Sequence, residues 1–378
     1  MTFHEFKGKY GRTYVEGTEE HTQREALFTR RAAAVASHNC KEGLSWKAGI
    51  NHLSDWTDTE FSGLLGFQGG ASPRATARAT DSGVLTFWSE DVQRSLPESF
   101  DWGRLASISS VRDQGACGSC WAFAAETVLR AHTEIRFGEH QNYSVGQIIA
   151  CTPNPRKCGG DGGCSGATVE LAYDYALHQD LLPESMFPYQ AAGGKHSCPQ
   201  GLQLASLSAR RARGVVTADG REVHMRVAGK EGIGRGVRMI GWTKFPENRQ
   251  AEMVRALVND GPLAIAVAAG QKWVSYMAGV LSARECEKFL ISHAVVLFGY
   301  GISSFKSQKF WHIKNSWGQD WGERGNVRLQ RFDDEEVVCG WDKQPQIGTG
   351  CKGGPREVWV CGSCGILYDT SMPILQKP

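Results

Sequence analysis

A cysteine, a histidine and an asparagine lie far apart in this sequence but could together carry out nucleophilic chemistry. Cys120 ends the glycine-rich run QGACGSC (residues 114–120), which leads into an apolar segment expected to be helical. At a helix N-terminus, exposed N–H groups and the helix dipole favour a thiolate over a thiol. His293 heads an apolar run, and Asn315 lies in KNSWG (residues 314–318). A thiol nucleophile needs a base, and the base needs a partner for its second ring nitrogen. We therefore predict Cys120 as nucleophile, His293 as its base and acid, and Asn315 as the residue that orients His293.

The same segment contains a Cys-x-x-Cys pair, Cys117 and Cys120. Such pairs also serve in thiol redox enzymes and in metal sites. Taken alone, the pair leaves these alternatives open. The histidine and asparagine that follow in the chain favour nucleophilic catalysis.

The chain that positions these residues falls into three parts, which differ in composition. Residues 1–67 are polar, and Leu27, Phe28, Ala32 and Val35 recur at helical spacing, which predicts a small helical domain. Residues 68–95 are rich in Gly, Ala, Ser and Thr and are expected to be a linker. Residues 96–378 begin with a helical half and continue into runs typical of buried strands. This part contains a basic insertion at about 200–244, expected to be a solvated surface segment rather than a binding patch, and a cysteine-rich insertion at about 339–363.

Bulk properties exclude several classes of function. A formal net charge of +2 gives no footprint for nucleic acid or an anionic membrane surface. No run of about 18 apolar residues is present, so no membrane span is expected. Twelve cysteines favour an oxidising compartment with several disulfides. The N-terminus shows no basic stretch followed by an apolar core, so no signal peptide is visible.

The blocks around Cys120 and Asn315 resemble the papain and cathepsin L family of cysteine proteases, almost letter for letter. The resemblance implies an α+β, papain-like fold of two lobes, one helical and one β-barrel-like, preceded by a helical inhibitory propeptide. It implies a cysteine endopeptidase made as a zymogen, with no cofactor or metal. By the same resemblance, Gln114 would stabilise the oxyanion, and Trp317 would shield the bond between His293 and Asn315. A catalytically impaired binding protein is the alternative, but such proteins usually lack the nucleophile, and Cys120 is present.

The N-terminal domain resembles the family's inhibitory propeptide. Its helix matches the family pattern at Glu20, Arg24, Phe28 and Asn39, Val35 replaces Ile, and Arg31 stands where Asn is expected. A second family signature appears as Gly49, Asn51, Leu53 and Asp55, with Leu for Phe. The resemblance further implies protein and peptide substrates, the propeptide as intramolecular inhibitor, cystatin-type inhibitors and a monomer. It places the enzyme in an acidic compartment such as the lysosome or vacuole, or outside the cell.

The resemblance also implies disulfides. It pairs Cys117 with Cys164 and Cys151 with Cys198, and leaves Cys286 with either Cys339 or Cys364, of which Cys364 is preferred. That choice leaves four extra cysteines, which favour additional disulfides over a zinc site: Cys158, Cys339, Cys351 and Cys361.

Substrate contacts follow from the same comparison. Gly166 and Ala167 match the wall along which an extended peptide would lie, and Ala167 replaces a glycine there. Ser292 stands where many relatives carry Asp. Counting five residues from Cys364 places Asp369 on the floor of the S2 pocket beside Ala266, which predicts Leu or Phe at P2, and Arg while Asp369 is ionised. The alternative is that Asp369 faces solvent. The complete set expected to contact substrate is Gly166, Ala167, Ala266, Ser292, Trp317 and Asp369.

Overall fold

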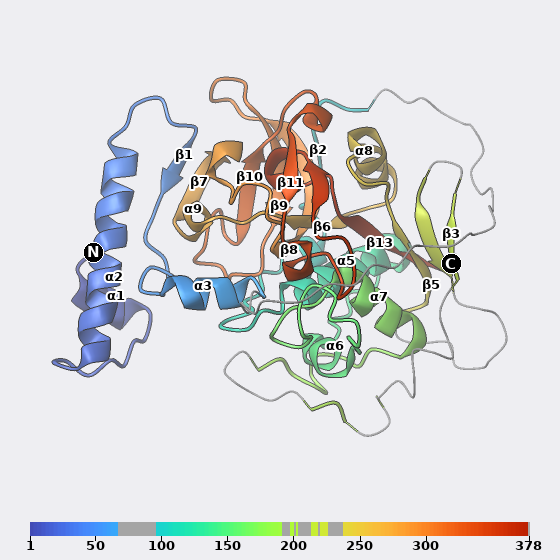
Figure 1. Ribbon diagram of the computed structural model, residues 1–378, viewed down its shortest axis with the longest axis horizontal. Helices are drawn as coiled ribbons and strands as arrows, with labels where there is room; N and C mark the ends of the chain where they lie inside the picture. Colours follow the sequence, from blue (N-terminus) through green and yellow to red (C-terminus); the bar gives the residue numbers. More distant parts are fainter. Residues whose placement is uncertain are drawn as a thin grey trace.

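The N-terminal unit lies at one end of the molecule, coloured blue in Figure 1. The computed structural model describes residues 1–66, 96–190, 197–199, 202, 213–217, 220–225 and 237–376. The unit consists of helices α1 (Phe3–Lys9), α2 (Glu19–Asn39) and α3 (Asp58–Leu64) and strand β1 (Trp46–Ala48). Its own small core is formed by Phe3, Phe6 and Phe28. The expected linker, residues 68–95, lies entirely outside the described residues.

Four helices form the helical lobe: α4 (Ala106–Ser109), α5 (Cys120–Phe137), α6 (Val145–Cys151) and α7 (Val169–His178). The first 14 residues of α5, from Cys120 to Thr133, are all buried, so this helix is the centre of the lobe. It ends at Gly138, whose φ of 68° is a left-handed conformation that glycine adopts without strain.

The second lobe is built on one large sheet with the strand order β1-β7-β10-β9-β8-β6-β13-β5-β4-β3. The strands are β3 (Arg213–Val216), β4 (Glu222–Met225), β5 (Met239–Lys244), β6 (Leu263–Val267), β7 (Tyr276–Leu281), β8 (His293–Ile302), β9 (Lys309–Lys314), β10 (Asn326–Gln330) and β13 (Thr370–Leu375), and β2 (Phe100–Asp101) pairs with β8 off this path. Among the described strands the order begins at β1 and ends at β3 without returning. The expected barrel-like lobe is therefore an open sheet rather than a closed barrel.

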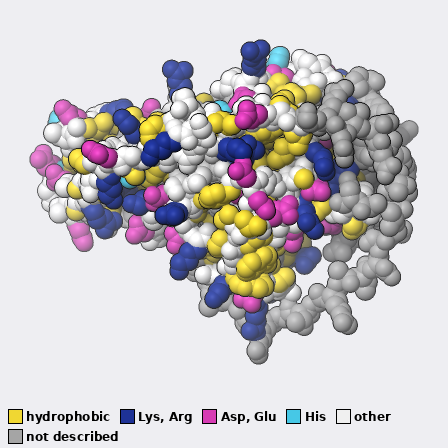
Figure 2. Space-filling model, turned by 90° about the horizontal axis from the view of Figure 1, so that it is seen from above, with side chains coloured by type: hydrophobic (Ala, Val, Ile, Leu, Met, Phe, Trp, Pro, Cys, Tyr) yellow, Lys and Arg dark blue, Asp and Glu magenta, His cyan; other side chains and the backbone are white. Residues whose placement is uncertain are grey.

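Two short helices, α8 (Gln250–Asn259) and α9 (Gln271–Val274), flank this sheet, with 3₁₀ turns at η2 (Ala283–Glu285), η3 (Glu335–Val337), η4 (Pro345–Ile347) and η5 (Ser363–Gly365). The helical lobe and the sheet each contain a separate hydrophobic core. On the face drawn in Figure 2, basic and acidic side chains of the described residues are interspersed. Among the described residues, no helix is long and apolar enough to cross a membrane.

The described parts of the two insertions form β-hairpins. The described part of the basic segment forms the hairpin β3–β4 and strand β5, which pairs with β13. Its last residue, Lys244, was expected to be solvated but is mostly buried, because its ammonium lies between two carboxylates. The cysteine-rich segment forms a second hairpin, β11 (Cys339–Asp342) with β12 (Val358–Cys361).

Five disulfides hold these parts together. The structure contains the three pairs preferred from the resemblance, Cys117–Cys164, Cys151–Cys198 and Cys286–Cys364. The remaining four cysteines form two more pairs, Cys339–Cys361 and Cys158–Cys351. Cys40 and Cys120 are free.

Candidate active site

Cys120 is the first residue of α5 and is almost fully buried. The preceding residue, Ser119, makes no side-chain cap, so the backbone N–H groups of the first turn remain available to an anion. The Ala294 N–H donates to the Cys120 sulfur at 3.5 Å. Burial nevertheless raises the pKa of the Cys120 thiol to about 11, so the thiol is neutral in this state.

His293 begins β8, and its ring lies across the same pocket as Cys120. Its Nε2 is 2.8 Å from Oδ1 of Asn315, which fixes the plane of the imidazole. The Trp317 ring lies over this pair, with its centroid 4.9 Å from that of the histidine. Burial lowers the pKa of His293 to about 4, against the bond to Asn315, which raises it. Thiol and imidazole are therefore both uncharged while the cleft is covered.

Gln114 is completely buried, and its side chain is held at both ends. The amide Nε2 donates to the Leu64 carbonyl of the N-terminal unit at 2.8 Å. Its Oε1 accepts from the Ser316 hydroxyl at 2.5 Å. A carbonyl oxygen of the N-terminal unit thus occupies the donor that was expected to stabilise an oxyanion. The role of Ser316 was missed from sequence, although the residue lies within the KNSWG motif.

The end of the N-terminal unit fills the cleft. Leu65 lines the pocket that contains Cys120. Gly66 lies against Gly118 and Gly166, and a Cβ on Gly118 would be 2.5 Å from the Gly66 Cα. Gly166 has a φ of 86°, which favours glycine at this point of close backbone approach. The expected peptide wall is therefore covered by the chain's own N-terminal segment.

The pocket beside Cys120 is lined by four of the other expected substrate residues, Ala167, Ala266, Ser292 and Asp369. Asp369 is only 7% exposed and does not face solvent. Its carboxylate lies 2.9 Å from Lys244 Nζ, which is also 3.4 Å from Glu170. Burial, together with the neighbouring charge of Glu170, raises the pKa of Asp369 to about 7, against the opposing effect of Lys244. The sequence analysis missed Lys244 as a counter-ion of Asp369. The three residues of this charged cluster, Glu170, Lys244 and Asp369, come from α7, β5 and the segment before β13.

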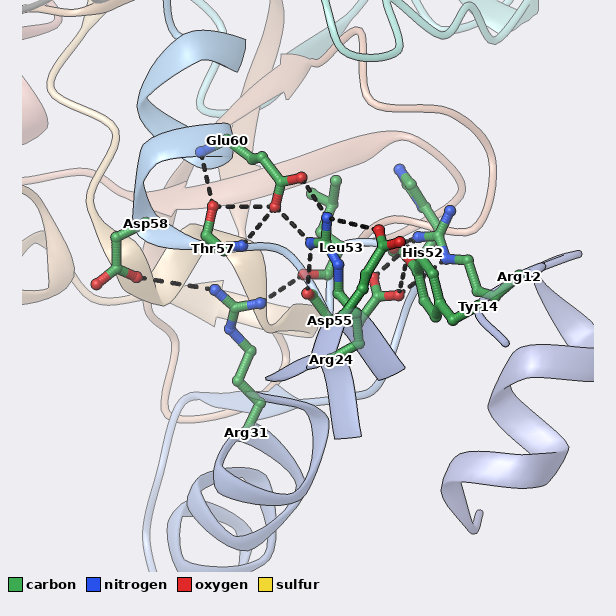
Figure 3. A network of polar contacts seen from close by, with 11 residues as sticks. Arg12, Tyr14, Arg24, Arg31, His52, Leu53, Asp55, Thr57, Asp58 and Glu60 are labelled. Atoms are coloured by element: carbon green, nitrogen blue, oxygen red, sulfur yellow. Dashed lines mark hydrogen bonds and ion pairs between the residues drawn. The ribbon is translucent and has the colours of Figure 1, made fainter. Parts of the chain in front are cut away.

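The N-terminal unit is held by a network of polar contacts drawn in Figure 3. The fully buried Asp55 accepts from Arg12 at 3.0 Å and from the Tyr14 hydroxyl at 2.8 Å. Arg24 donates through both terminal nitrogens to Glu60, at 2.5 and 2.6 Å. Glu20, in contrast, is exposed and 3.9 Å from Arg24.

Arg31, which departs from the family pattern, belongs to the same network. Its guanidinium donates to the Leu53 carbonyl at 2.7 Å and lies 4.0 Å from Asp58. These contacts lie within the unit, whereas strand β1 attaches it to the second lobe by pairing with β7. The unit thus docks by extending the sheet, in addition to filling the cleft.

Comparisons with known proteins agree with this geometry. Residues 96–349 match the family model described as papain family cysteine protease, and residues 3–61 match the cathepsin propeptide inhibitor domain (I29). The chain belongs to the papain family of cysteine proteases.

Among its relatives, ananain of Ananas comosus is 28% identical over 358 residues, covering 94% of this chain and 89% of ananain. A cathepsin L-like proteinase of Fasciola hepatica is 27% identical, covering 87% of each chain. The solved recombinant stem bromelain precursor is 26% identical with a TM-score of 0.69, covering 99% of this chain and 98% of that one. The chain is thus a cysteine endopeptidase in zymogen form, whose propeptide domain acts as an intramolecular inhibitor.

Proposed function

We propose that Cys120 is the nucleophile of this endopeptidase, with His293 as base and acid, Asn315 as the group that orients it, and Gln114 as an oxyanion donor. The observation that supports the assignment is the bond that Gln114 Nε2 donates to the Leu64 carbonyl, because the proposed oxyanion donor already binds a peptide carbonyl of the propeptide. The propeptide is assigned to residues 1–67 and the catalytic domain to residues 96–378. Activation cleavage is assigned to the linker at 68–95.

In the proposed reaction His293 takes the proton of the Cys120 thiol, and the thiolate attacks the carbonyl carbon of the scissile bond. The charge on oxygen is stabilised by Gln114 Nε2 and the backbone N–H of Cys120. His293 then donates its proton to the departing amine, which leaves an acyl-thioenzyme. Water loses a proton to His293 and hydrolyses the thioester, and the proton returns to the Cys120 sulfur.

Burial by the propeptide explains why the zymogen is inactive in this scheme. With a thiol pKa of about 11 and an imidazole pKa of about 4, the charged pair does not form. Removal of Leu64, Leu65 and Gly66 from the cleft would admit water and lower the cost of charging both groups.

For the S2 pocket we propose Leu or Phe as the P2 residue at acidic pH. Asp369 has the position required to meet an Arg side chain, but with a pKa near 7 it is largely neutral in acid, and Lys244 already occupies one side of it. Acceptance of Arg at P2 should therefore increase as the pH rises through about 7. Gly166 and Ala167 would bind the peptide backbone, Ala266 and Ser292 would line the pocket, and Trp317 would contact substrate while covering the His293–Asn315 bond.

The setting proposed for this enzyme is an acidic compartment of the lysosome or vacuole type, or the outside of the cell, with a monomeric enzyme controlled by cystatin-type inhibitors. Support comes from family membership and from the five disulfides, which suit an oxidising environment.

The deciding experiment is titration of the activated enzyme with an epoxide that alkylates active-site thiols, followed by peptide mapping. We expect one equivalent of label, on Cys120. The zymogen should resist labelling, because its thiol is neutral and covered. An active enzyme that loses its activity to the epoxide while Cys120 stays unmodified would refute the assignment.

A further inference from the structure

The loop between β11 and β12 crosses from one wall of the active-site cleft to the other. We propose that residues 342–351, called the strap, are the end wall of the cleft on the side of the acyl group, so that an extended substrate is bound through P2 and leaves the cleft there. The strap would thus limit how many substrate residues before the scissile bond contact the enzyme. This inference rests on the proposed assignment of the pocket beside Cys120 as S2.

The first anchor of the strap is on the sheet side of the cleft. The completely buried Asp342 accepts from the Ile291 N–H at 3.2 Å and from the Gln344 N–H at 2.8 Å. Farther along, Gly348 packs directly on the backbone of Ile291, so that a Cβ at Gly348 would collide with the Ile291 carbonyl. Ile291 lies two residues before His293. The strap is therefore fixed to the wall that contains the proposed base.

The second anchor is on the helical side. Cys351 forms a disulfide with Cys158, which lies 193 residues earlier in the chain. The Gly159 N–H donates to the Gly350 carbonyl at 2.9 Å. A Cβ on Gly159 would lie 2.9 Å from the Ala167 carbonyl oxygen. The strap is thus attached to the loop that packs on the substrate wall at Ala167.

Between these anchors the crossing is short. From Gly348 to Gly350 an extended chain spans at most about 7 Å, and the strap folds on itself through bonds from the Thr349 and Gly350 N–H groups to the Pro345 carbonyl. A buried carboxylate bond at one end and a disulfide at the other leave little freedom to swing aside. The strap is a fixed wall rather than a lid.

The position of the strap limits the length of the cleft. Ile347 and Gly348 line the same pocket as Cys120 and Asp369. In the zymogen Leu65 of the propeptide also lines that pocket. In the proposed complex the P2 side chain would occupy this pocket, between the nucleophile and the strap. A residue before P2 would meet the strap where the chain of a substrate would otherwise continue along the wall.

The test measures kcat/KM for fluorogenic peptides with one, two, three or four residues before the scissile bond. Active-site titration sets the concentration of the activated enzyme. For the wild type we expect a gain of at least tenfold from the second residue, and less than a twofold change from the third and fourth.

A strap-less variant has residues 343–357 replaced by an Asn-Gly turn and carries Cys158→Ser. Asp342 pairs with Val358 in the hairpin, so a two-residue turn can close it. We expect the third and fourth residues to raise kcat/KM at least fivefold in this variant. The matched control, Cys339→Ser with Cys361→Ser, removes a disulfide of the same hairpin that does not cross the cleft, and should keep the wild-type profile.

A milder variant, Ile347→Ala, keeps every anchor of the strap and only shortens a side chain that lines the pocket. In this variant, a third residue before the scissile bond should raise kcat/KM two- to threefold. If the strap-less protein gives no titratable thiol, this variant decides the matter. The proposal is overturned if the wild type gains more than fivefold beyond P2, or if every variant that can be titrated has the wild-type profile. Failure of the wild type to react with the epoxide would refute the assignment of Cys120 instead, so the two failures are distinguishable.

Discussion

Glu60→Gln should loosen the propeptide above about pH 5 and have little effect in stronger acid. Glu60 accepts two bonds from Arg24, at 2.5 and 2.6 Å, and caps its own helix by accepting from the Thr57 N–H at 2.7 Å. Burial raises the pKa of Glu60, but the bonds from Arg24 and Thr57 more than offset burial and lower it below its usual value. The carboxylate therefore stabilises the folded propeptide above pH 4.5, and this stabilisation is lost as the pH falls through the lowered pKa.

The magnitude follows from the exposure of the pair. A bond to a charged group contributes about 1.5–3 kcal/mol when buried, but the Glu60 side chain is 38% exposed. Solvent screening reduces the loss in Glu60→Gln to about 1 kcal/mol. Since 1.36 kcal/mol corresponds to a factor of ten, the open form of the propeptide should be populated about fivefold more.

The assay uses zymogens that carry Cys120→Ser, so that they cannot cleave themselves. A trace of activated wild-type enzyme is added, and the loss of the full-length chain is followed by gel at pH 6 and pH 4. We expect Glu60→Gln to be processed about fivefold faster at pH 6, and we expect a smaller difference from its parent at pH 4, where the Glu60 carboxylate begins to be protonated.

The control is Asp58→Asn, which removes a carboxylate from the same helical turn. Asp58 is 72% exposed and 4.0 Å from Arg31, so processing should change less than twofold. The reasoning is wrong if Glu60→Gln is processed no faster than its parent at pH 6, or if Asp58→Asn accelerates processing equally.

Three further predictions concern the activated enzyme. Cys120→Ser should reduce peptidase activity more than about a thousandfold with unchanged thermal unfolding, and greater residual turnover of a fluorogenic peptide would contradict its role as nucleophile. Ser316→Ala should lower kcat about tenfold with little change in KM, because Gln114 loses the hydroxyl that holds its amide in place. If Ser316→Ala lowers kcat equally when it is introduced into a Gln114→Ala variant, Ser316 does not act through Gln114. The ratio of rates for Arg and Leu at P2 should rise as the pH passes about 7, the pKa of Asp369, and should be flat in Asp369→Asn; a rise that survives this substitution would remove Asp369 from the S2 floor.

The residues proposed for catalysis were chosen from the sequence because each stands in a short, recognisable pattern. A cysteine after a glycine-rich turn and before an apolar run was expected at a helix N-terminus, and Cys120 is the first residue of α5. His293 and Asn315 were added because a thiol nucleophile needs a base and the base needs an orienting partner, and the resemblance then agreed with this choice. The structure places His293 and Asn315 in contact at 2.8 Å.

The disulfide network could be predicted only in part. The pair Cys339–Cys361 closes a local hairpin, yet nothing in the spacing of the extra cysteines selected it over other pairings. Cys158 and Cys351 lie in different lobes, and only the docking of the lobes decides that they meet. A sequence contains the reactive groups but not the distances between segments that are remote along the chain.

The sequence by itself therefore determined the family, the zymogen organisation and the residues proposed for catalysis, because each is written in a short run of neighbouring residues. Tertiary structure alone decided three matters that change how the enzyme would act. It placed Lys244 against Asp369, gave Arg31 a carbonyl partner in the propeptide, and carried the strap across the cleft. In each case the partners come from separate elements, and their contact depends on how the sheet, the helices and the propeptide pack together.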